Sequence, residues 1–338
     1  MATPTTAIQR YDMSLTRKDF DLAANRAGFI GTKVYPPVSV AKPNAEFTRI
    51  TVSSLLKKPA DTTRAPKTAY GRTSFEFTTD NYSTSEKGRE QAVDDAELEL
   101  YGEFLPVEMM ARDQILDELM QDHEQNVANA VFDTARFTGA ATVALSNADR
   151  FSNHSVALPI DVIKAGKRSV RARCGRPANC LVVPEIVLDH MVECSQIIER
   201  IKYSGKDDPK DIGINELKKM LRLEHILVAD GFSNTKNDGQ TPVFGRHWDP
   251  TMLMVCRIST DGALLSEISP CIGRTVMWQK QNATIPGADN AEAAIIFEEY
   301  REENVRGGVI RGRWNWGIKD FATECGYLVT NVTDGTEI

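Results

Sequence analysis

Several features that would mark a familiar class of protein are missing from these 338 residues. No uninterrupted apolar run approaches the roughly 18 to 20 residues that a membrane-spanning helix needs. Residues 1–8 have no basic region leading into an apolar one, so no signal peptide is visible, and we expect an intracellular protein without membrane contact. Apolar and charged residues make up 41% and 26%, which excludes a wholly disordered chain or a fibrous repeat.

The six cysteines form no recognisable scheme. No CxxC pair occurs, and the nearest metal-like grouping is His190 with Cys194, one helical turn apart, and Cys180 upstream. A structural zinc site needs four ligands in paired spacing. We therefore predict buried core thiols, no disulfide, no metal and no cofactor.

Catalytic motifs are also missing. The chain has no GxxxxGK[ST], no GxSxG, no HExxH, and no GxGxxG after a strand. The histidines are scattered, at positions 123, 154, 190, 225 and 247, and His123 is interpreted as a packed or half-exposed side chain. We predict no catalytic residue and no enzyme. An enzyme with an unrecognised site stays the alternative, and a concave pocket with convergent polar groups would reveal it.

The net charge of −7 is unevenly distributed. Residues 1–72 carry twelve basic and five acidic residues, a charge of +7, and residues 73–338 carry −14. Residues 83–137 hold fourteen acidic residues against four basic ones. The acidic total argues against simple coating of nucleic acid. The two charged regions are interpreted either as surfaces that meet, within a chain or between copies, or as a solvated patchwork.

Residues 1–66 are rich in proline and have little core of their own. Proline at this frequency blocks long helices, so we predict an extended arm that lies across another element or another subunit. Residues 67–96 follow as a second extended region. Phe75 and Phe77 alternate with polar residues, as in a half-exposed strand, and residues 79–81 are the expected turn of a projecting hairpin. This hairpin is too poor in apolar residues to be stable alone.

A long helix is predicted from Pro106 to about Phe132, with a length of about 40 Å at 1.5 Å per residue. Its apolar residues recur at steps of 4, 7, 4, 7 and 4, which indicates one apolar stripe along a nearly straight helix. The stripe, which is interpreted as core packing with a groove for a partner as the alternative, consists of Leu105, Met109, Leu116, Met120, Val127 and Val131. Acidic residues are expected on the remaining surface, namely Asp113, Asp117, Glu118, Asp122 and Glu124.

The rest of the chain alternates helices and strands. A helix starting at Pro159 carries five basic residues, Lys164, Lys167, Arg168, Arg171 and Arg173. A strand at 181–183, one helix from 184 to 201, a helix at 216–221, a strand at 226–229 and a loop at 230–242 follow. Five late strands are expected at 252–258, 274–279, 294–301, 309–318 and 327–332. The pattern predicts a mixed α+β protein with mostly antiparallel late strands.

In this order, the local motifs resemble the major capsid protein family of tailed bacteriophages, which shares the Hong Kong phage-type capsid fold. Segment 29–40 (FIGTKVYPPVSV) looks like that family's arm, which reaches over a neighbour, and segment 74–95 looks like its extended loop. The acidic stretch 97–137 looks like its spine helix. Segment 179–188 (NCLVVPEIVL) is similar to the entry into its axial domain, and 313–320 (RWNWGIKD) resembles a returning peripheral strand.

The resemblance implies an α+β phage capsid fold in five parts. These are an N-terminal arm (1–66), an extended loop formed by a projecting β-hairpin (67–96), a peripheral domain with the spine helix (97–178), an axial domain (179–300) and returning peripheral strands (301–338). The implied function is that of a structural major capsid protein. Its hexamers and pentamers would form an icosahedral shell around phage DNA in the virion, after synthesis in the host bacterial cytoplasm.

The resemblance also implies partners. They are further copies of the chain, a portal, a decoration protein, and double-stranded DNA contacted non-specifically on the inner face. A separate scaffolding protein is implied because the arm begins almost at once. Covalent crosslinking is not predicted, since Lys87 lies near the loop but no asparagine partner can be matched.

Two further hypotheses and one alternative stay open. The basic arm and the acidic loop-and-spine region are expected to meet across subunits, and the Lys164 to Arg173 face either contacts packaged DNA or is a solvated helix face. The alternative is another virion protein, a decoration or tail subunit. A tail tube would lack the long helix, so the apolar stripe argues against that alternative.

Overall fold

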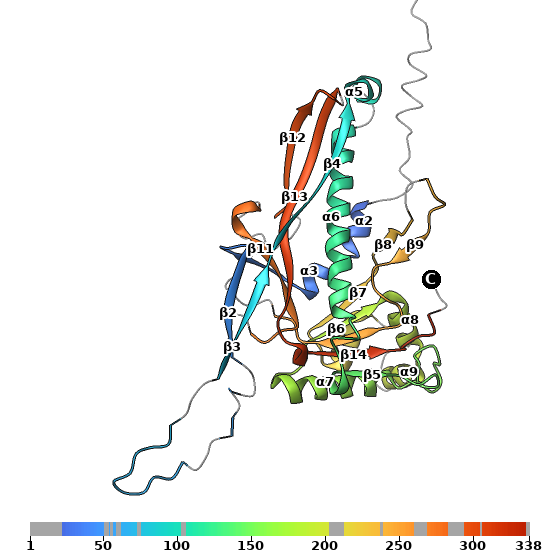
Figure 1. Cartoon of the computed structure of the whole chain (residues 1–338). Coiled ribbons are helices and arrows are strands. Elements are labelled where there is room, and N and C mark those ends of the chain that lie inside the picture. The colour runs from blue at the N-terminus through green and yellow to red at the C-terminus, as the bar shows by residue number, and fades with distance from the viewer. Residues whose placement is uncertain are drawn as a thin grey trace, which may run out of the picture.

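A computed structural model describes residues 22–50, 54, 57–58, 62–72, 76–102, 106–202, 213–236, 239–259, 269–282, 294–304 and 306–335. Figure 1 shows an elongated region, in which helix α6 runs beside strands β4, β12 and β13, standing on a compact region with a second sheet. Strands β2 and β3 extend to one side. The mixed α+β class predicted from the sequence is confirmed.

The elongated region is built on the first sheet. Its members are β1 (Pro37–Val40), β11 (Gly273–Trp278), β13 (Gly307–Asp320) and β12 (Ile296–Glu302), in that order, with β4 (Ser85–Asp94) also paired to β13. All pairs are antiparallel except β1 with β11. Helix α5 (Asp95–Tyr101) follows β4, and α6 (Val107–Val131) packs along β13 and β4. Gly312 permits this packing, because a Cβ there would lie 2.5 Å from Cγ2 of Ile115.

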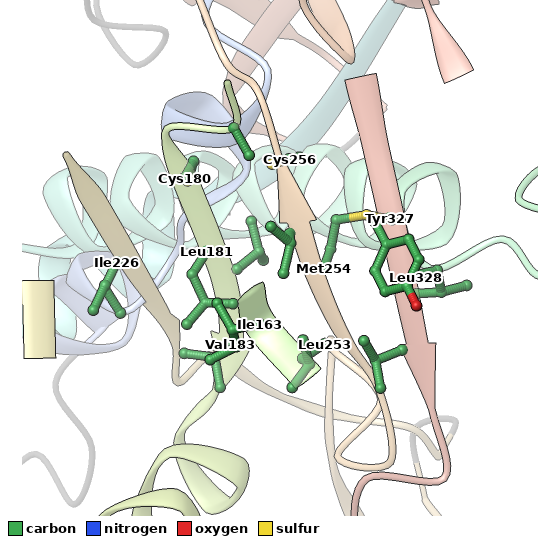
Figure 2. Packing of buried hydrophobic residues seen from close by; sticks show 14 of the residues in the cluster. Ile163, Cys180, Leu181, Val183, Ile226, Leu253, Met254, Cys256, Tyr327 and Leu328 are labelled. Carbon is green, nitrogen blue, oxygen red and sulfur yellow. The ribbon is translucent and has the colours of Figure 1, made fainter. Parts of the chain in front are cut away.

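The compact region contains the second sheet. Its order is β5 (Thr142–Ala144), β14 (Gly326–Thr330), β10 (Leu253–Cys256), β6 (Cys180–Pro184) and β7 (His225–Ala229). Figure 2 shows side chains of β6, β7, β10 and β14 packed together with Ile163 of α7 (Pro159–Cys174). All residues of β6 and β10 are buried, as expected for strands covered on both faces. Helices α8 (Glu185–Glu193), α9 (Ser195–Lys202) and α10 (Ile214–Leu221) complete this region.

Part of the predicted arm folds against its own chain. Helices α2 (Leu22–Ala27) and α3 (Gly31–Val34) contact α6, and the side chains of Phe29, Ile30 and Tyr35 are buried. Segment 29–40 thus lies across another element of its own chain, where its apolar side chains complete the core beside α6. Its contact with a neighbouring copy stays a prediction. Residues 1–21 lie outside the described residues.

The extended loop differs from the prediction in its strand pairing. Strand β2 (Asn44–Ile50) pairs antiparallel with β3 (Phe77–Ser83), so residues 79–81 lie inside a strand and form no turn. Strand β4 leaves this hairpin and joins β13 instead. The hairpin is mostly exposed and is anchored at its base by a small cluster of Val38, Val40, Tyr82 and Val276.

The long helix is confirmed, whereas its predicted stripe is confirmed only in part. Met120, Val127 and Val131 are buried, but Met109 is exposed and Leu105 lies outside the described residues. Two residues expected on the surface, Asp117 and Glu124, are buried. The reason is that α2 and α3 cover this face of α6, which the helical period alone does not reveal.

Several other predicted helices, strands and loops agree with the structure only in part. The five late strands are confirmed, but the single helix expected from 184 to 201 is two helices, because Cys194 has extended backbone angles. The expected loop at 230–242 contributes to a small hairpin of β8 (Phe232–Asn234) and β9 (Phe244–Arg246). Short 3-10 helices span Gly139–Ala141, Gln279–Gln281 and Thr323–Cys325.

Sheet membership differs from the expected ranges. Helix α7, assigned to the peripheral range, packs on the second sheet, whereas β11 and β12 belong to the first sheet although they fall mainly in the axial range. Strand β14 pairs in the second sheet, not the first. The predicted ranges follow the order of the sequence, whereas strands that are far apart in the sequence pair with one another in both sheets. Among the described residues, no helix has the length and apolar content to cross a membrane.

Candidate assembly surface

Two hollows on the described surface contain polar side chains that already have partners. One, of about 360 Å³, lies beside α5 and contains Asp95 and Arg301, which already bind each other at 2.8 Å. Another, of about 420 Å³, contains His247, whose Nδ1 lies 3.1 Å from Oε1 of Gln125. Burial lowers the pKa of His247 to about 4, so its ring is neutral at physiological pH.

A buried carboxylate attaches the N-terminal segment to the spine helix. Oε1 of Glu124 accepts hydrogen bonds from the backbone N–H of Ile30 at 2.9 Å and from Nε1–H of Trp248 at 2.6 Å. Oε2 accepts the N–H of Gly31 at 2.6 Å, at the start of α3. Burial raises the pKa of Glu124, and the three donors oppose that rise. One side chain thus joins α3, α6 and the segment before β10.

The sequence contained a signal for this buried carboxylate. Glu124 lies four residues after Met120 and three before Val127, so it falls on the apolar face of α6. Glu124 was predicted to lie on the surface because it is charged and isolated buried carboxylates are rare. Only the donors of Ile30, Gly31 and Trp248, which are far away in the sequence, make its burial tolerable.

His123 is packed, as predicted. It is fully buried between Trp314 and Trp316, with ring centroids 5.3 and 4.8 Å away, and its Nε2 lies 2.9 Å from Oγ1 of Thr275. The Thr275 hydroxyl donates to the carbonyl of Tyr35, so it accepts from His123, which fixes the Nε2–H tautomer. Burial, and then the charge of Lys87, lowers the pKa of His123 to about 3.

Ion pairs between the basic and acidic regions form within the chain. Arg26 of the predicted arm lies 3.8 Å from Asp117 on the spine. Spine acids also pair with β4, through Lys87 with Asp122 at 2.7 Å and Arg89 with Glu118 at 3.2 Å. Part of the acidic surface is therefore neutralised before any neighbour arrives. The two pairs with β4 are largely exposed, so each contributes little to stability, whereas the side chains of Arg26 and Asp117 are largely buried.

Exposed apolar side chains gather at one end of the elongated region. We define the tip patch as Leu100 and Tyr101 of α5 with Met109 and Met110 of α6, of which Leu100 and Met109 are 64% and 65% exposed. Figure 1 shows α5 at the end of α6, at the same end of the elongated region as the upper ends of β12 and β13. Exposed apolar side chains in a group are a candidate contact surface.

The basic residues of α7 separate into two groups. Lys167 donates to the carbonyls of Leu221 and Arg222 at 2.6 and 2.8 Å, and Arg173 donates to those of Thr323 and Gly326. These two cations satisfy carbonyl groups of neighbouring segments. Lys164, Arg168 and Arg171 are exposed at intervals of four and three residues, so they share one face of α7. We call these three residues the basic face.

The six cysteines are buried and free, as predicted. The metal-like grouping of the sequence does not form, since Cys194 donates its thiol to the carbonyl of His190 and Cys180 lies in β6. The Sγ atoms of Cys174 and Cys325 lie 2.8 Å apart, and this contact lowers the pKa of Cys174 to about 7.

Structural comparison places this chain among proteins with the phage capsid fold. The match to a phage-related protein from Bordetella bronchiseptica has a TM-score of 0.68 at 20% identity and covers 98% of this chain and 97% of that one. The capsid of cyanophage P-SCSP1u matches with a TM-score of 0.57 at 10% identity, over 88% and 86% of the two chains. The mature capsid of bacteriophage PhiM1 gives 0.55 at 10% identity, over 93% and 88%. The predicted capsid fold is confirmed.

Sequence comparison leads to a particular relative. The chain is 26% identical over 140 residues to the major capsid protein of Burkholderia phage BcepMu. The match covers 41% of this chain and 44% of that relative, so it spans less than half of the relative's length. No protein-family model matches the chain.

Proposed function

We propose that this chain is a structural major capsid protein whose copies form the hexamers and pentamers of an icosahedral shell around phage DNA. The observation that carries the proposal is the phage capsid fold over 88% or more of the chain in each of the three structures compared. The sequence similarity to the major capsid protein of phage BcepMu supports the same function. The elongated shape gives each copy several separate surfaces for neighbours, each of modest area, which lets misplaced subunits dissociate during assembly.

Each region has a proposed role. The first sheet with α5 and α6 is the peripheral domain, and the second sheet with α7 to α10 is the axial domain. The β2–β3 hairpin, which has little core of its own, is the extended loop that lies on a neighbouring copy. A separate scaffolding protein, a portal and a decoration protein are the remaining proposed partners. The assembled protein would belong to the virion after synthesis in the host bacterial cytoplasm.

Electron microscopy of the purified protein tests the proposal. We expect closed shells or rings of five or six copies when the protein is expressed alone or with a scaffolding protein from the same phage. A stable monomer under all of these conditions would contradict the shell function.

Assembly should also slow at high salt if pairing between the basic segment and the acidic spine guides neighbours together.

The tip patch should be a contact between copies. Met109→Asp places a charge on an apolar surface that would be buried in the shell, and this should raise the protein concentration needed for assembly at least tenfold, about 1.4 kcal/mol per contact. Light scattering recorded at increasing protein concentration measures the concentration at which assembly begins. Because Met109 is exposed, the melting temperature should change by no more than a few degrees.

Val156→Asp is a matched control for the tip patch. Val156 is an exposed valine that precedes α7, away from the patch, so the same introduced charge should leave assembly unchanged. Equal assembly of wild-type protein and Met109→Asp would show that the tip patch is not an interface.

The basic face should contact DNA. Three exposed cations on one side of α7 match a phosphate backbone, whereas Lys167 and Arg173 are engaged with carbonyl groups. Lys164 also pairs with the exposed Asp161 at 3.4 Å, a contact that solvent screens. Reversing Lys164, Arg168 and Arg171 to glutamate should reduce the slope of log K against log salt for duplex DNA by about 2 to 3. A matched reversal of the exposed residues Arg200, Lys202 and Lys219 keeps the net charge equal. Equal slopes and equal DNA packaging in both variants would favour a solvated helix.

A further inference from the structure

Three potential metal ligands meet at a corner of the compact region. His190 and Glu193 lie three residues apart on α8, which places their side chains on the same side of the helix. His154 comes from the segment before α7, and its carbonyl accepts the N–H of Ser195, the first residue of α9, at 2.9 Å. This backbone bond holds the His154 segment against the junction of α8 and α9.

The distances among these side chains suit a small divalent ion. Nε2 of His154 lies 3.0 Å from Nδ1 of His190, and the other ring nitrogen of His154, Nδ1, lies 3.4 Å from Oε2 of Glu193, so an ion would take only one of these two nitrogens. One ligand atom from each residue can be chosen so that all three lie within 4.8 Å of one another. Two nitrogens bound to tetrahedral zinc at 2.0–2.1 Å are about 3.3 Å apart. A small rotation of either ring would therefore admit an ion in place of the hydrogen bond between the imidazoles.

The surroundings also favour a cation. Helix α8 carries Glu185, Asp189 and Glu193 and has no lysine or arginine. His154, His190 and Glu193 are half-buried or exposed, so an ion can reach them from solvent. The neighbouring Cys194 is not a ligand here, because its Sγ–H points to the carbonyls of His190 and Phe151.

We propose that His154, His190 and Glu193 form a binding site for one divalent transition-metal ion of the zinc class. Two imidazoles and one carboxylate select zinc, cobalt, nickel or copper over magnesium and calcium, which prefer oxygen ligands. Three protein ligands leave the fourth position for water. The bound ion links the segment before α7 to the junction of α8 and α9, and so stabilises this corner of the molecule. The inference does not depend on the proposed shell function.

Titration of the untagged full chain with Zn²⁺, and with Co²⁺ as a spectroscopic probe, tests the site. We expect one ion per chain, the visible absorption of four-coordinate Co²⁺, and a melting temperature that rises with Zn²⁺ but not with Mg²⁺. His154→Ala should weaken Zn²⁺ binding at least tenfold. Glu193→Gln, which keeps the shape of the side chain, should weaken binding without altering the fold, as judged by circular dichroism.

His225→Ala is the control. His225 is exposed at the first residue of β7, so its loss should leave Zn²⁺ binding unchanged. Absence of saturable binding at 100-fold excess of Zn²⁺ over protein would overturn the proposal. Equal affinities of wild-type protein and both ligand variants would likewise assign the binding to other groups.

Discussion

Glu124→Ala is expected to lower the free energy of unfolding by about 3–5 kcal/mol. The variant leaves three buried N–H groups, those of Ile30, Gly31 and Trp248, without their acceptor. Each unsatisfied buried donor costs about 1–3 kcal/mol, and a water that enters the new space can recover part of this. Urea unfolding of the unassembled subunit, followed by circular dichroism, measures the loss.

Two further variants make the Glu124 prediction specific. Gly31→Ala adds a methyl group 2.6 Å from Oε2 of Glu124, so it should disturb the same contact, and the double variant should lose less than the sum of the single losses. Glu118→Ala removes an exposed carboxylate from the same helix and should cost less than about 0.5 kcal/mol. A loss below about 1 kcal/mol in Glu124→Ala would mean that the three donors find other acceptors.

The disruption should extend beyond the site itself. Helices α2 and α3 rest on α6, and β1 continues from them into the first sheet. Loosening Ile30 and Gly31 therefore frees the strand that pairs with β11 and carries Val38 and Val40 at the base of the β2–β3 hairpin. We expect faster amide exchange in β1 and β11 of Glu124→Ala than in β6 and β10.

Acid should destabilise the subunit through His123. Unfolded histidine accepts a proton near pH 6.5, whereas the folded pKa of His123 is about 3, so between these values the unfolded state binds one more proton. The free energy of unfolding should then fall by about 1.4 kcal/mol for each pH unit below 6.5, and the loss is complete near pH 3. Lys87 is the charged group whose field adds to the effect of burial.

A variant separates His123 from the other acid-sensitive groups. His123→Gln keeps a donor for Thr275 but cannot titrate, so it should be less stable than wild type at pH 7 and lose less on acidification. The difference in free energy of unfolding between wild type and His123→Gln should shift by about 2.3 kcal/mol, against wild type, from pH 6.5 to pH 4.5. Denaturant unfolding at both pH values measures it, with His225→Ala as the exposed control. Parallel pH curves for wild type and His123→Gln would show that folding does not lower the pKa of His123.

Many elements of the fold were predictable because their signals are local. The long helix at Val107–Val131 follows from a repeat at helical spacing, and the five late strands follow from short apolar runs between turn residues. The burial of the cysteines was predictable because their irregular spacing fits no metal site, which leaves packing in the core as their expected role. The order of these elements also carried the resemblance to capsid proteins, because the sequence of arm, loop, spine and strands is a property of the linear chain.

The candidate surfaces were predictable only in part. The cluster of basic residues on α7 is visible in the sequence, but Lys167 and Arg173 bind carbonyls from segments about 55 and 150 residues away along the chain. The tip patch contains Met109, which the apolar stripe assigned to the core. A side chain's partner is decided by which segments meet in space, and spacing along one helix does not contain that information.

The sequence by itself thus determined the long helix and the late strands, the mixed α+β class, the burial of the cysteines and the uneven charge, because each depends on composition or on contacts between near neighbours. Tertiary structure alone decided that β3 pairs with β2 while β4 pairs with β13, and that residues 29–40 complete the core of their own chain. It also decided that Glu124 is buried and that His154 meets His190. These outcomes depend on long-range pairing, where the gain from burying several segments together exceeds the preference of any one residue for water.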